Sequence, residues 1–285
     1  MSVTPPARHA HEDLPEFVRR IGETSLLRRA FASAVTRAID SGWTTRTPLR
    51  THIVICGFPR AGTTLLSLMM QVAYSTAKAF PKERAAFRVA YRTDRSHAIL
   101  ISKRPDDIFY LDRTRRIYAR RRPTVRFLLM MRDPRAVLTS VHAGRKDDYY
   151  VSPRRWMATY DRMRANWEQN DCQVVKFEDL VTDLPAVQRA IVNFVGEEPD
   201  APFDAYVDRV PDGFQVEALN GVRALDTATT SKWRAPRHRD RIRLLLREIP
   251  DLPRILIDTG YEPDERWIAE YAAGAGAANA PAQRI

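Results

Sequence analysis

The chain has little cysteine, no long apolar run and no apolar leader. Only two of its 285 residues are cysteines, and both Cys56 and Cys172 stand beside apolar, strand-like runs. Two thiols without paired histidines make a poor zinc site, so we expect two buried, reduced thiols in a cytoplasmic protein. No run approaches the ~18 apolar residues of a membrane-spanning helix, and the N-terminus shows no secretory signal.

The charge of the chain is strongly of one sign. Its formal net charge is +11 and its pI is near 10.0, while 44% hydrophobic residues and a mean hydropathy of -0.40 are ordinary for a soluble protein. A basic surface favours acidic ligands: nucleotides, sulfated or phosphorylated compounds, anionic membranes or nucleic acid. The charge comes mainly from arginine, which a GC-rich genome could supply without a functional demand.

Apolar, β-branched runs alternate with segments of helical periodicity. Such alternation predicts an α/β fold with a central parallel β-sheet flanked by helices, and the loop described below makes it a three-layer P-loop-like domain. Residues 1–13 are expected to be a disordered leader, 14–270 a single α/β domain, and 271–285 a disordered tail. The predicted strands are 52–57, 98–103, 124–131 and 172–177, and the predicted helices are 14–40, 62–73, 106–121, 133–143, 153–169, 184–195, 237–248 and 250–259.

The first predicted strand ends in a phosphate-binding type of loop. It reads GFPRAGTT over residues 57–64, and a helix-like run follows. Gly57 and Gly62 have the spacing of the nucleotide-triphosphate motif G-x-x-x-x-G-K-[ST], but Thr63 stands where that motif has lysine. The cation of the loop is Arg60 instead. The loop is therefore suited to a phosphate-like group, without the lysine that reaches a β- or γ-phosphate.

Two later segments complete a family pattern. The third strand ends in Arg132-Asp133-Pro134-Arg135, with Ser140 shortly after, and the fourth ends in Phe177-Glu178-Asp179-Leu180. Together with the loop, in this order, they resemble the sulfotransferases that use 3′-phosphoadenosine-5′-phosphosulfate (PAPS). The resemblance spans roughly residues 50–260, and the PR-x-G-T-T form is similar to the tyrosylprotein and bacterial members. Two positions differ from the common pattern, since Phe177 replaces a tyrosine and Ala61 a serine.

The resemblance implies a donor site at the carboxyl ends of the strands, where loops of a parallel sheet converge. Arg132 and Ser140 match the residues that hold the 3′-phosphate, and their spacing of about two helical turns lets both face one pocket if a helix joins them. A loose match to the family's basic closing loop adds Lys232 and Arg234. The 5′-phosphosulfate is expected to contact Arg60, Ala61, Gly62, Thr63 and Thr64, through backbone N–H groups and hydroxyls at a helix N-terminus.

The predicted catalytic residues are Arg60 and Glu83. Arg60 would stabilise negative charge in the transition state. Glu83 lies in the interval where the tyrosylprotein enzymes carry an essential glutamate, and the region after the second strand has no histidine to act as a base. A solvated glutamate between Lys82 and Arg84 is the alternative for Glu83, with Asp106 and Asp107 as the next candidates.

Other charged residues are expected to be structural. Arg135 should pair with Asp133, and Glu178 and Asp179 should hold the exit loop of the fourth strand. The run from Arg113 to Arg122 is typical of a solvated helix face, although a docking patch for an anionic acceptor or a membrane surface stays open.

The implied reaction is sulfuryl transfer from PAPS to a hydroxyl or amine, releasing adenosine 3′,5′-bisphosphate. We expect no metal requirement, because no carboxylate cluster for magnesium is visible. The acceptor, whether a small molecule, carbohydrate, lipid or peptide, stays open, as does the oligomeric state; nucleic acid is not expected as a partner. The alternatives are a P-loop kinase of a small molecule, which should carry the missing lysine, and a non-catalytic binder of nucleotides or nucleic acid.

Overall fold

Four parallel strands form the central sheet of the computed structural model, which describes residues 15–18, 21, 25–142, 145–214, 216–219 and 221–272. The sheet order is β2 (Ile99–Lys103), β1 (Thr51–Gly57), β3 (Thr124–Met131) and β6 (Cys172–Lys176). Every neighbouring pair is parallel, so all the strands end at one edge. All residues of β1 are buried, as expected for a strand covered on both faces. The predicted α/β fold with a flanked parallel sheet is confirmed.

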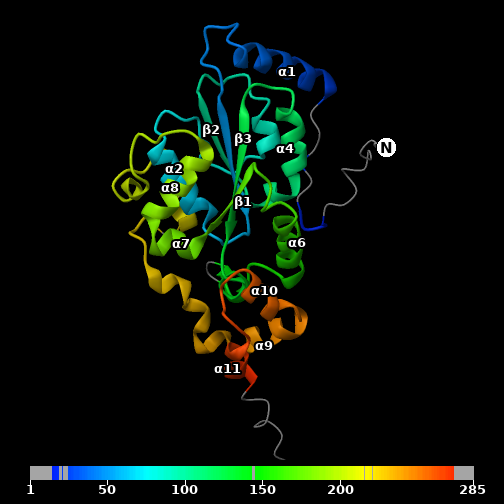
Figure 1. Ribbon diagram of the computed structural model, residues 1–285, viewed down its shortest axis with the longest axis vertical. Helices are drawn as coiled ribbons and strands as arrows, with labels where there is room; N and C mark the ends of the chain where they lie inside the picture. Colours follow the sequence, from blue (N-terminus) through cyan, green and yellow to red (C-terminus); the bar gives the residue numbers. More distant parts are fainter. Residues whose placement is uncertain are drawn as a thin grey trace, which may run out of the picture.

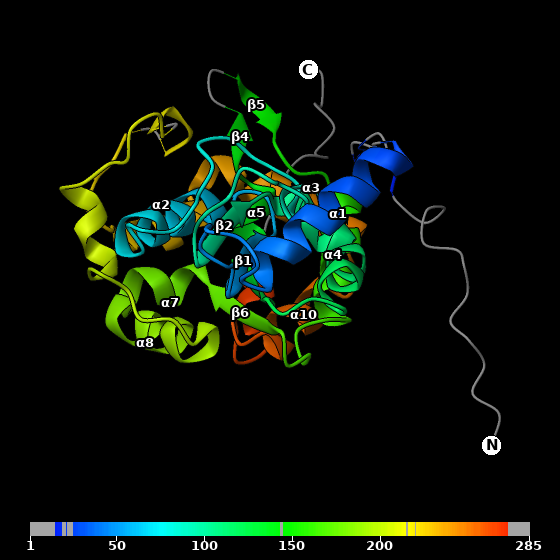
Figure 2. The same cartoon turned by 90° about the horizontal axis from the view of Figure 1, so that it is seen from above.

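Helices cover the sheet on both sides (Figure 1). In the view from above, α2, α7 and α8 lie on one side and α4 on the other (Figure 2). Helices α9, α10 and α11 gather at one end of the molecule (Figure 1). None of the helices in the described part of the chain has the length and apolar character of a membrane span. The helices are α1 (Leu26–Asp40), α2 (Thr63–Ala73), α3 (Ala86–Val89), α4 (Leu111–Tyr118), α5 (Pro134–Leu138), α6 (Pro153–Arg164), α7 (Phe177–Thr182), α8 (Leu184–Val195), α9 (Arg239–Glu248), α10 (Leu252–Asp258) and α11 (Ala269–Ala272).

Three segments differ from the sequence prediction. The helix predicted for 133–143 stops at Leu138, and an antiparallel hairpin of β4 (Val141–His142) and β5 (Arg145–Tyr149) follows. The Thr139 hydroxyl donates to the Arg135 carbonyl at 2.6 Å, a local bond that competes with continued helix. The segment after β6 is the short helix α7 rather than a loop.

The ends of the predicted domain also differ in detail. The N-terminal helix begins at Leu26 rather than at residue 14. At the other end, α11 reaches two residues into the predicted tail, where Tyr271 is buried beside Trp267. The leader 1–13 and the tail from 273 lie outside the described residues.

Two glycines hold the loop after β1 against β3 and α7. Gly57 has φ +122°, and a Cβ there would lie 2.4 Å from the Met130 carbonyl oxygen. Gly62 has φ +89°, and a Cβ would lie 2.6 Å from Cδ2 of Phe177. Both positions therefore need glycine, for the left-handed backbone and for the close approach.

We expect Gly62→Ala to destabilise the fold more than Gly196→Ala does. Gly196 also has a positive φ, +73°, but nothing lies within 4 Å of its Cβ position. Both variants incur left-handed strain of about 1–2 kcal/mol, and Gly62→Ala adds overpacking of about 1–3 kcal/mol. Urea unfolding of the two variants measures the difference. Equal losses, or no recovery when Phe177→Leu is added to Gly62→Ala, would contradict this packing.

Candidate active site

Arg60 lies at the tip of the loop between β1 and α2. It is the one non-glycine residue with a positive φ in the described chain, at +65°, a conformation that usually marks a constrained turn. Its Nε donates to the Ser140 hydroxyl at 2.8 Å, and its guanidinium carbon lies 5.6 Å from the centre of the Tyr150 ring. The sequence predicted Ser140 on a helix, but it lies between α5 and β4. The structure nevertheless brings these two predicted site residues together.

Arg132 follows β3 and lies directly beneath the loop. It donates through Nη1 to the Arg60 carbonyl at 3.1 Å and through Nη2 to the Thr229 carbonyl at 2.9 Å, and it stacks on the Phe177 ring at 4.2 Å. Its Nε is buried and has no hydrogen-bond partner among the described residues. Burial lowers the pKa of this guanidinium. The hydrogen-bond partners of Arg132 are neutral, so an anion would find a cation with unused donors.

The N-terminus of α2 opens onto the same place. Gly62 is its N-cap, and no side chain accepts a hydrogen bond from the first turn. The first N–H groups of a helix have no partner within the helix and carry partial positive charge, so such an end attracts anions. Of the residues predicted to contact the 5′-phosphosulfate, Ala61 and Thr63 are buried and Thr64 is half-buried. Only some of their side chains are therefore open to solvent.

The predicted closing loop lies beside Arg132, since Thr229 supplies one of its acceptors. Trp233 is buried and packs against the Arg135 guanidinium, with its ring centre 3.7 Å away. Lys232 is exposed. Arg234 instead lies 3.8 Å from Glu262 and 3.7 Å from Glu270, so it would have to leave these carboxylates to contact a nucleotide.

Arg135 has the structural role that the sequence predicted. It is 1% exposed, pairs with Asp133 at 2.8 Å and contacts Glu262 at 2.5 Å. Glu178 accepts the Asp133 backbone N–H at 3.1 Å, and burial raises the pKa of this carboxyl. These contacts join the segment after β3 to α7, and they hold Arg132 between the two.

Glu83 lies in the segment between α2 and α3, and its side chain contacts Lys103, the last residue of β2. Its carboxylate accepts a hydrogen bond from Lys103 Nζ at 3.0 Å, and its side chain is 50% exposed. Lys103 is the register partner of Ile55 in β1. The predicted base is thus a solvent-accessible glutamate that is held in place by one ion pair.

The two reserve candidates for a base serve the packing. Asp106 pairs with Arg155 at 2.9 Å. Asp107 is 1% exposed, accepts the Ala86 backbone N–H at 2.9 Å and lies 3.5 Å from Arg104. Burial raises the pKa of Asp107 to about 7. Because its carboxyl is enclosed, Asp107 cannot approach an acceptor without a rearrangement.

The Asp107 carboxyl predicts a pH-dependent stability. In the unfolded chain it loses its proton near pH 3.8, whereas in the fold it keeps the proton until about pH 7. The folded state binds more protons across this window, so its stability falls as the pH rises through it. Asp107→Asn should remove about 3–4 kcal/mol of that fall, measured by urea unfolding from pH 4 to 8. The exposed-site control Asp112→Asn should keep the wild-type profile; an unchanged profile in Asp107→Asn would contradict the assignment.

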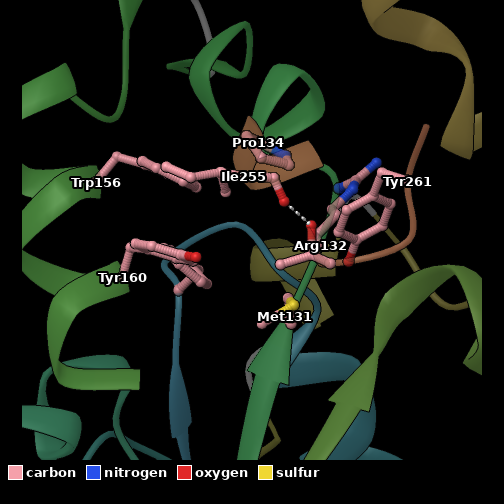
Figure 3. A pocket seen from close by; sticks show the side chains of 9 residues that line it. Met131, Arg132, Pro134, Trp156, Tyr160, Ile255 and Tyr261 are labelled. Carbon is pink, nitrogen blue, oxygen red and sulfur yellow. Dashed lines mark hydrogen bonds between the residues drawn. The ribbon is translucent and has the colours of Figure 1, made fainter. Parts of the chain in front are cut away.

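A small cavity lies behind Arg132, between the end of β3 and helices α6 and α10 (Figure 3). Arg132 and Tyr261 lie side by side, with Trp156 and Tyr160 of α6 opposite them (Figure 3). Its volume of about 10 Å³ admits a single water at most. This cavity belongs to the packing beneath the loop and has no room for a nucleotide.

Sequence reasoning missed two partners of the site, the Tyr150 ring and the Thr229 carbonyl. Neither carries a motif, and Tyr150 follows a hairpin that the sequence did not predict, since only its first strand fell within the helix predicted for 133–143. Among the described residues, no group of three or more His, Cys, Asp or Glu side chains is placed to hold a metal ion.

Part of this chain matches a family model. Residues 73–201 match the model of the sulfotransferase family. This segment contains Glu83, Arg132 and Ser140 and begins after the phosphate loop. A search of the curated proteins finds no match.

Two solved structures are similar to the chain. One is the sulfotransferase domain of the olefin synthase of Synechococcus PCC 7002, with 17% identity, 67% of this chain and 90% of that chain covered, and a TM-score of 0.49. The other is the sulfotransferase domain from the curacin biosynthetic pathway, with 16% identity, 67% and 92% covered, and a TM-score of 0.48. The match of residues 73–201 confirms the resemblance to the sulfotransferase family that the sequence motifs predicted.

Proposed function

We propose that the protein transfers a sulfuryl group from PAPS to a hydroxyl or amine of an acceptor, releasing adenosine 3′,5′-bisphosphate. The observation that carries the proposal is the position of Arg132. This cation has neutral hydrogen-bond partners and one buried N–H without a partner, and it lies next to Arg60 and the uncapped end of α2. Two anion-binding features in one place suit a ligand with two anionic groups.

The residues present fit such a donor. The N–H groups at the start of α2, with Thr63 and Thr64, would hold the 5′-phosphosulfate. Arg132 and Ser140 would hold the 3′-phosphate, with Lys232 reaching it from an exposed position. When bound, PAPS supplies an activated sulfuryl group, whose bond to the bridging oxygen breaks as a bond to the acceptor forms. Arg60 would shift from Ser140 toward the bridging oxygen and stabilise the charge that develops there.

The acceptor must lose one proton as the new bond forms. Glu83 is the proposed base, because its carboxylate pairs with Lys103 at the carboxyl end of β2 and is half exposed. Lys103 orients the Glu83 carboxylate through one oxygen and leaves the other for the proton. Catalysis in this scheme rests on positioning and electrostatics, as in phosphoryl transfer, and no step uses a metal.

We also propose the domain bounds and the cellular location of the protein. We take residues 14–270 as one catalytic domain. The two cysteines in the described chain, Cys56 and Cys172, are buried and unpaired, which supports reduced thiols and a cytoplasmic location.

Loss of Arg132 tests the donor site. Arg132→Ala should weaken binding of adenosine 3′,5′-bisphosphate by roughly 1.5–3 kcal/mol, since it removes charge-assisted hydrogen bonds. Titration calorimetry measures the change. Arg126→Ala removes an arginine from the opposite end of the same strand and should leave the affinity unchanged. Equal affinities in the wild type and Arg132→Ala would overturn the assignment.

Nucleotide preference separates a PAPS-dependent sulfotransferase from a P-loop kinase. Adenosine 3′,5′-bisphosphate should raise the melting temperature, and Mg-ATP should do so weakly, because the loop lacks the lysine that reaches a γ-phosphate. A larger shift with Mg-ATP than with the bisphosphate would favour a P-loop kinase. If binding is confirmed, mass spectrometry of native extracts incubated with labelled PAPS can identify the acceptor.

A further inference from the structure

Helix α1 presents apolar side chains to solvent. Leu26 is 77% exposed, Leu27 83% and Phe31 70%, and Trp43 in the following turn is 85% exposed. Leu27, Phe31 and Ala34 follow helical spacing and therefore share one face. The sequence predicted a helix over residues 14–40, and the buried residues of α1 are Thr36, Ile39 and Asp40. The apolar face is left without a partner among the described residues.

The C-terminal half of α1 fixes this face in place. Asp40 accepts two hydrogen bonds of 2.6 Å from Nη2 of Arg95, and both side chains are 2% exposed. Arg121 of the neighbouring segment donates to the Ser33 hydroxyl at 3.4 Å and to the Ala90 carbonyl at 2.9 Å. The exposed apolar residues thus belong to an anchored helix.

A basic cleft lies between α1 and α4. Its volume is about 620 Å³. Arg29, Ser33 and Arg37 line it from α1 at intervals of four residues, so they share the side of the helix that also carries Leu26, whereas Leu27 and Phe31 lie on a separate exposed side. The hydrogen bonds of Arg116 and Arg121 go to carbonyl and hydroxyl oxygens rather than to carboxylates. The arginines that line this cleft are Arg29, Arg37, Arg113, Arg116, Arg120 and Arg121.

We propose that α1 and this arginine cleft form a docking surface for an anionic lipid bilayer. Leu26, Leu27 and Phe31 would enter the boundary between headgroups and acyl chains, as apolar faces of interfacial helices do. The arginines would bind lipid phosphates, for which a planar guanidinium is suited. Trp43 adds a residue type that favours the headgroup level.

The position of α1 leaves the candidate active site open on a docked molecule. The helix lies across the end of the molecule opposite to α9, α10 and α11 (Figure 1). The phosphate loop lies at the carboxyl ends of the strands, and residues of α10 pack behind Arg132. Docking would therefore locate the enzyme at a membrane without covering its donor loop.

Other occupants fit this surface less well. A second copy of the chain would bring two arginine clefts together, and like charges at close range repel. Nucleic acid would satisfy the arginines but would leave the leucines and Phe31 in water, because its backbone offers no apolar surface. A bilayer with anionic headgroups offers phosphates to the arginines and an apolar interior to the exposed side chains of α1.

Vesicle co-sedimentation of the full chain tests the proposal. The protein should bind vesicles of phosphatidylcholine with phosphatidylglycerol and should remain unbound with phosphatidylcholine alone. Arg116→Gln/Arg120→Gln should weaken partitioning about 25-fold, at about fivefold for each arginine near an anionic surface. Arg189→Gln/Arg247→Gln removes the same charge from exposed arginines of α8 and α9 and should bind as the wild type does. Leu27→Ser/Phe31→Ser should lower the binding that persists in high salt by roughly tenfold.

Several results would overturn the proposal. Equal binding to both vesicle types, or equal losses in the two arginine pairs, would mean that this surface is not the docking site. A dimer by light scattering that Leu27→Ser/Phe31→Ser abolishes would assign the apolar face to a second copy. Retention on duplex DNA that outcompetes the vesicles would assign the cleft to nucleic acid. Unchanged melting temperatures of the variants exclude unfolding as the cause of any loss.

Discussion

Glu83→Gln should abolish most turnover while leaving donor binding intact. The substitution keeps the shape of the side chain and one acceptor oxygen for Lys103 Nζ, which lies 3.0 Å from the carboxylate in the wild type. It removes the basicity that the acceptor proton requires, and a general base typically contributes about 10²–10⁴ in rate. The expected result is a fall in kcat of that size with the affinity for adenosine 3′,5′-bisphosphate preserved. Steady-state kinetics with the identified acceptor and calorimetry with the bisphosphate measure the two quantities.

Two further variants control for this assignment. Glu198→Gln makes the same change at an exposed glutamate outside the site and should leave kcat unchanged. Lys103→Met removes the ion-pair partner of Glu83, and it should lower kcat while leaving bisphosphate affinity intact, because the carboxylate loses the contact that orients it. If Glu83→Gln retains kcat within about threefold, general-base catalysis by Glu83 is excluded. The enclosed Asp107 would then need a conformational change to replace it.

Arg60→Ala should lower kcat by about two to three orders of magnitude, as the loss of a donor aimed at developing charge does. The bisphosphate affinity should fall much less, because Arg132 and the N-terminus of α2 remain. Alanine keeps a Cβ on the left-handed backbone of +65° that Arg60 already adopts, so the loop gains no new strain. Kinetics and calorimetry on the same preparations separate the two effects.

Ser140→Ala is the matched control for Arg60→Ala. It removes the hydroxyl that accepts from Arg60 Nε at 2.8 Å and leaves the guanidinium in place. One hydrogen bond of this kind contributes about 0.5–1.5 kcal/mol. Because Ser140 is proposed to hold the 3′-phosphate, the bisphosphate affinity should fall roughly 2–12-fold, whereas kcat should keep most of its value. An Arg60→Ala enzyme that turns over normally and shows only a higher KM for PAPS would make Arg60 a binding residue without a transition-state role.

The local features of this protein could be predicted from its sequence. The runs ending at Gly57 and Met131 are buried strands, because β-branched and apolar residues in short runs fit a covered sheet. The spacing of Gly57 and Gly62 predicted the sharp loop after β1, because its left-handed turns favour glycine, whereas the contacts of these glycines with Met130 and Phe177 come from the fold. The pairing of Arg135 with Asp133 is local for the same reason.

Only the tertiary structure decided which distant residues meet. Arg132 donates to the carbonyl of Thr229, 97 residues further on, and Ser140 contacts Arg60 from the segment between α5 and β4 rather than from the predicted helix. Periodicity shows which residues of α1 are apolar, but it does not show what covers them, and Leu27 and Phe31 are exposed. Secondary structure follows from neighbours along the chain, whereas burial, ion pairs and the shape of a site depend on the path by which remote segments pack together.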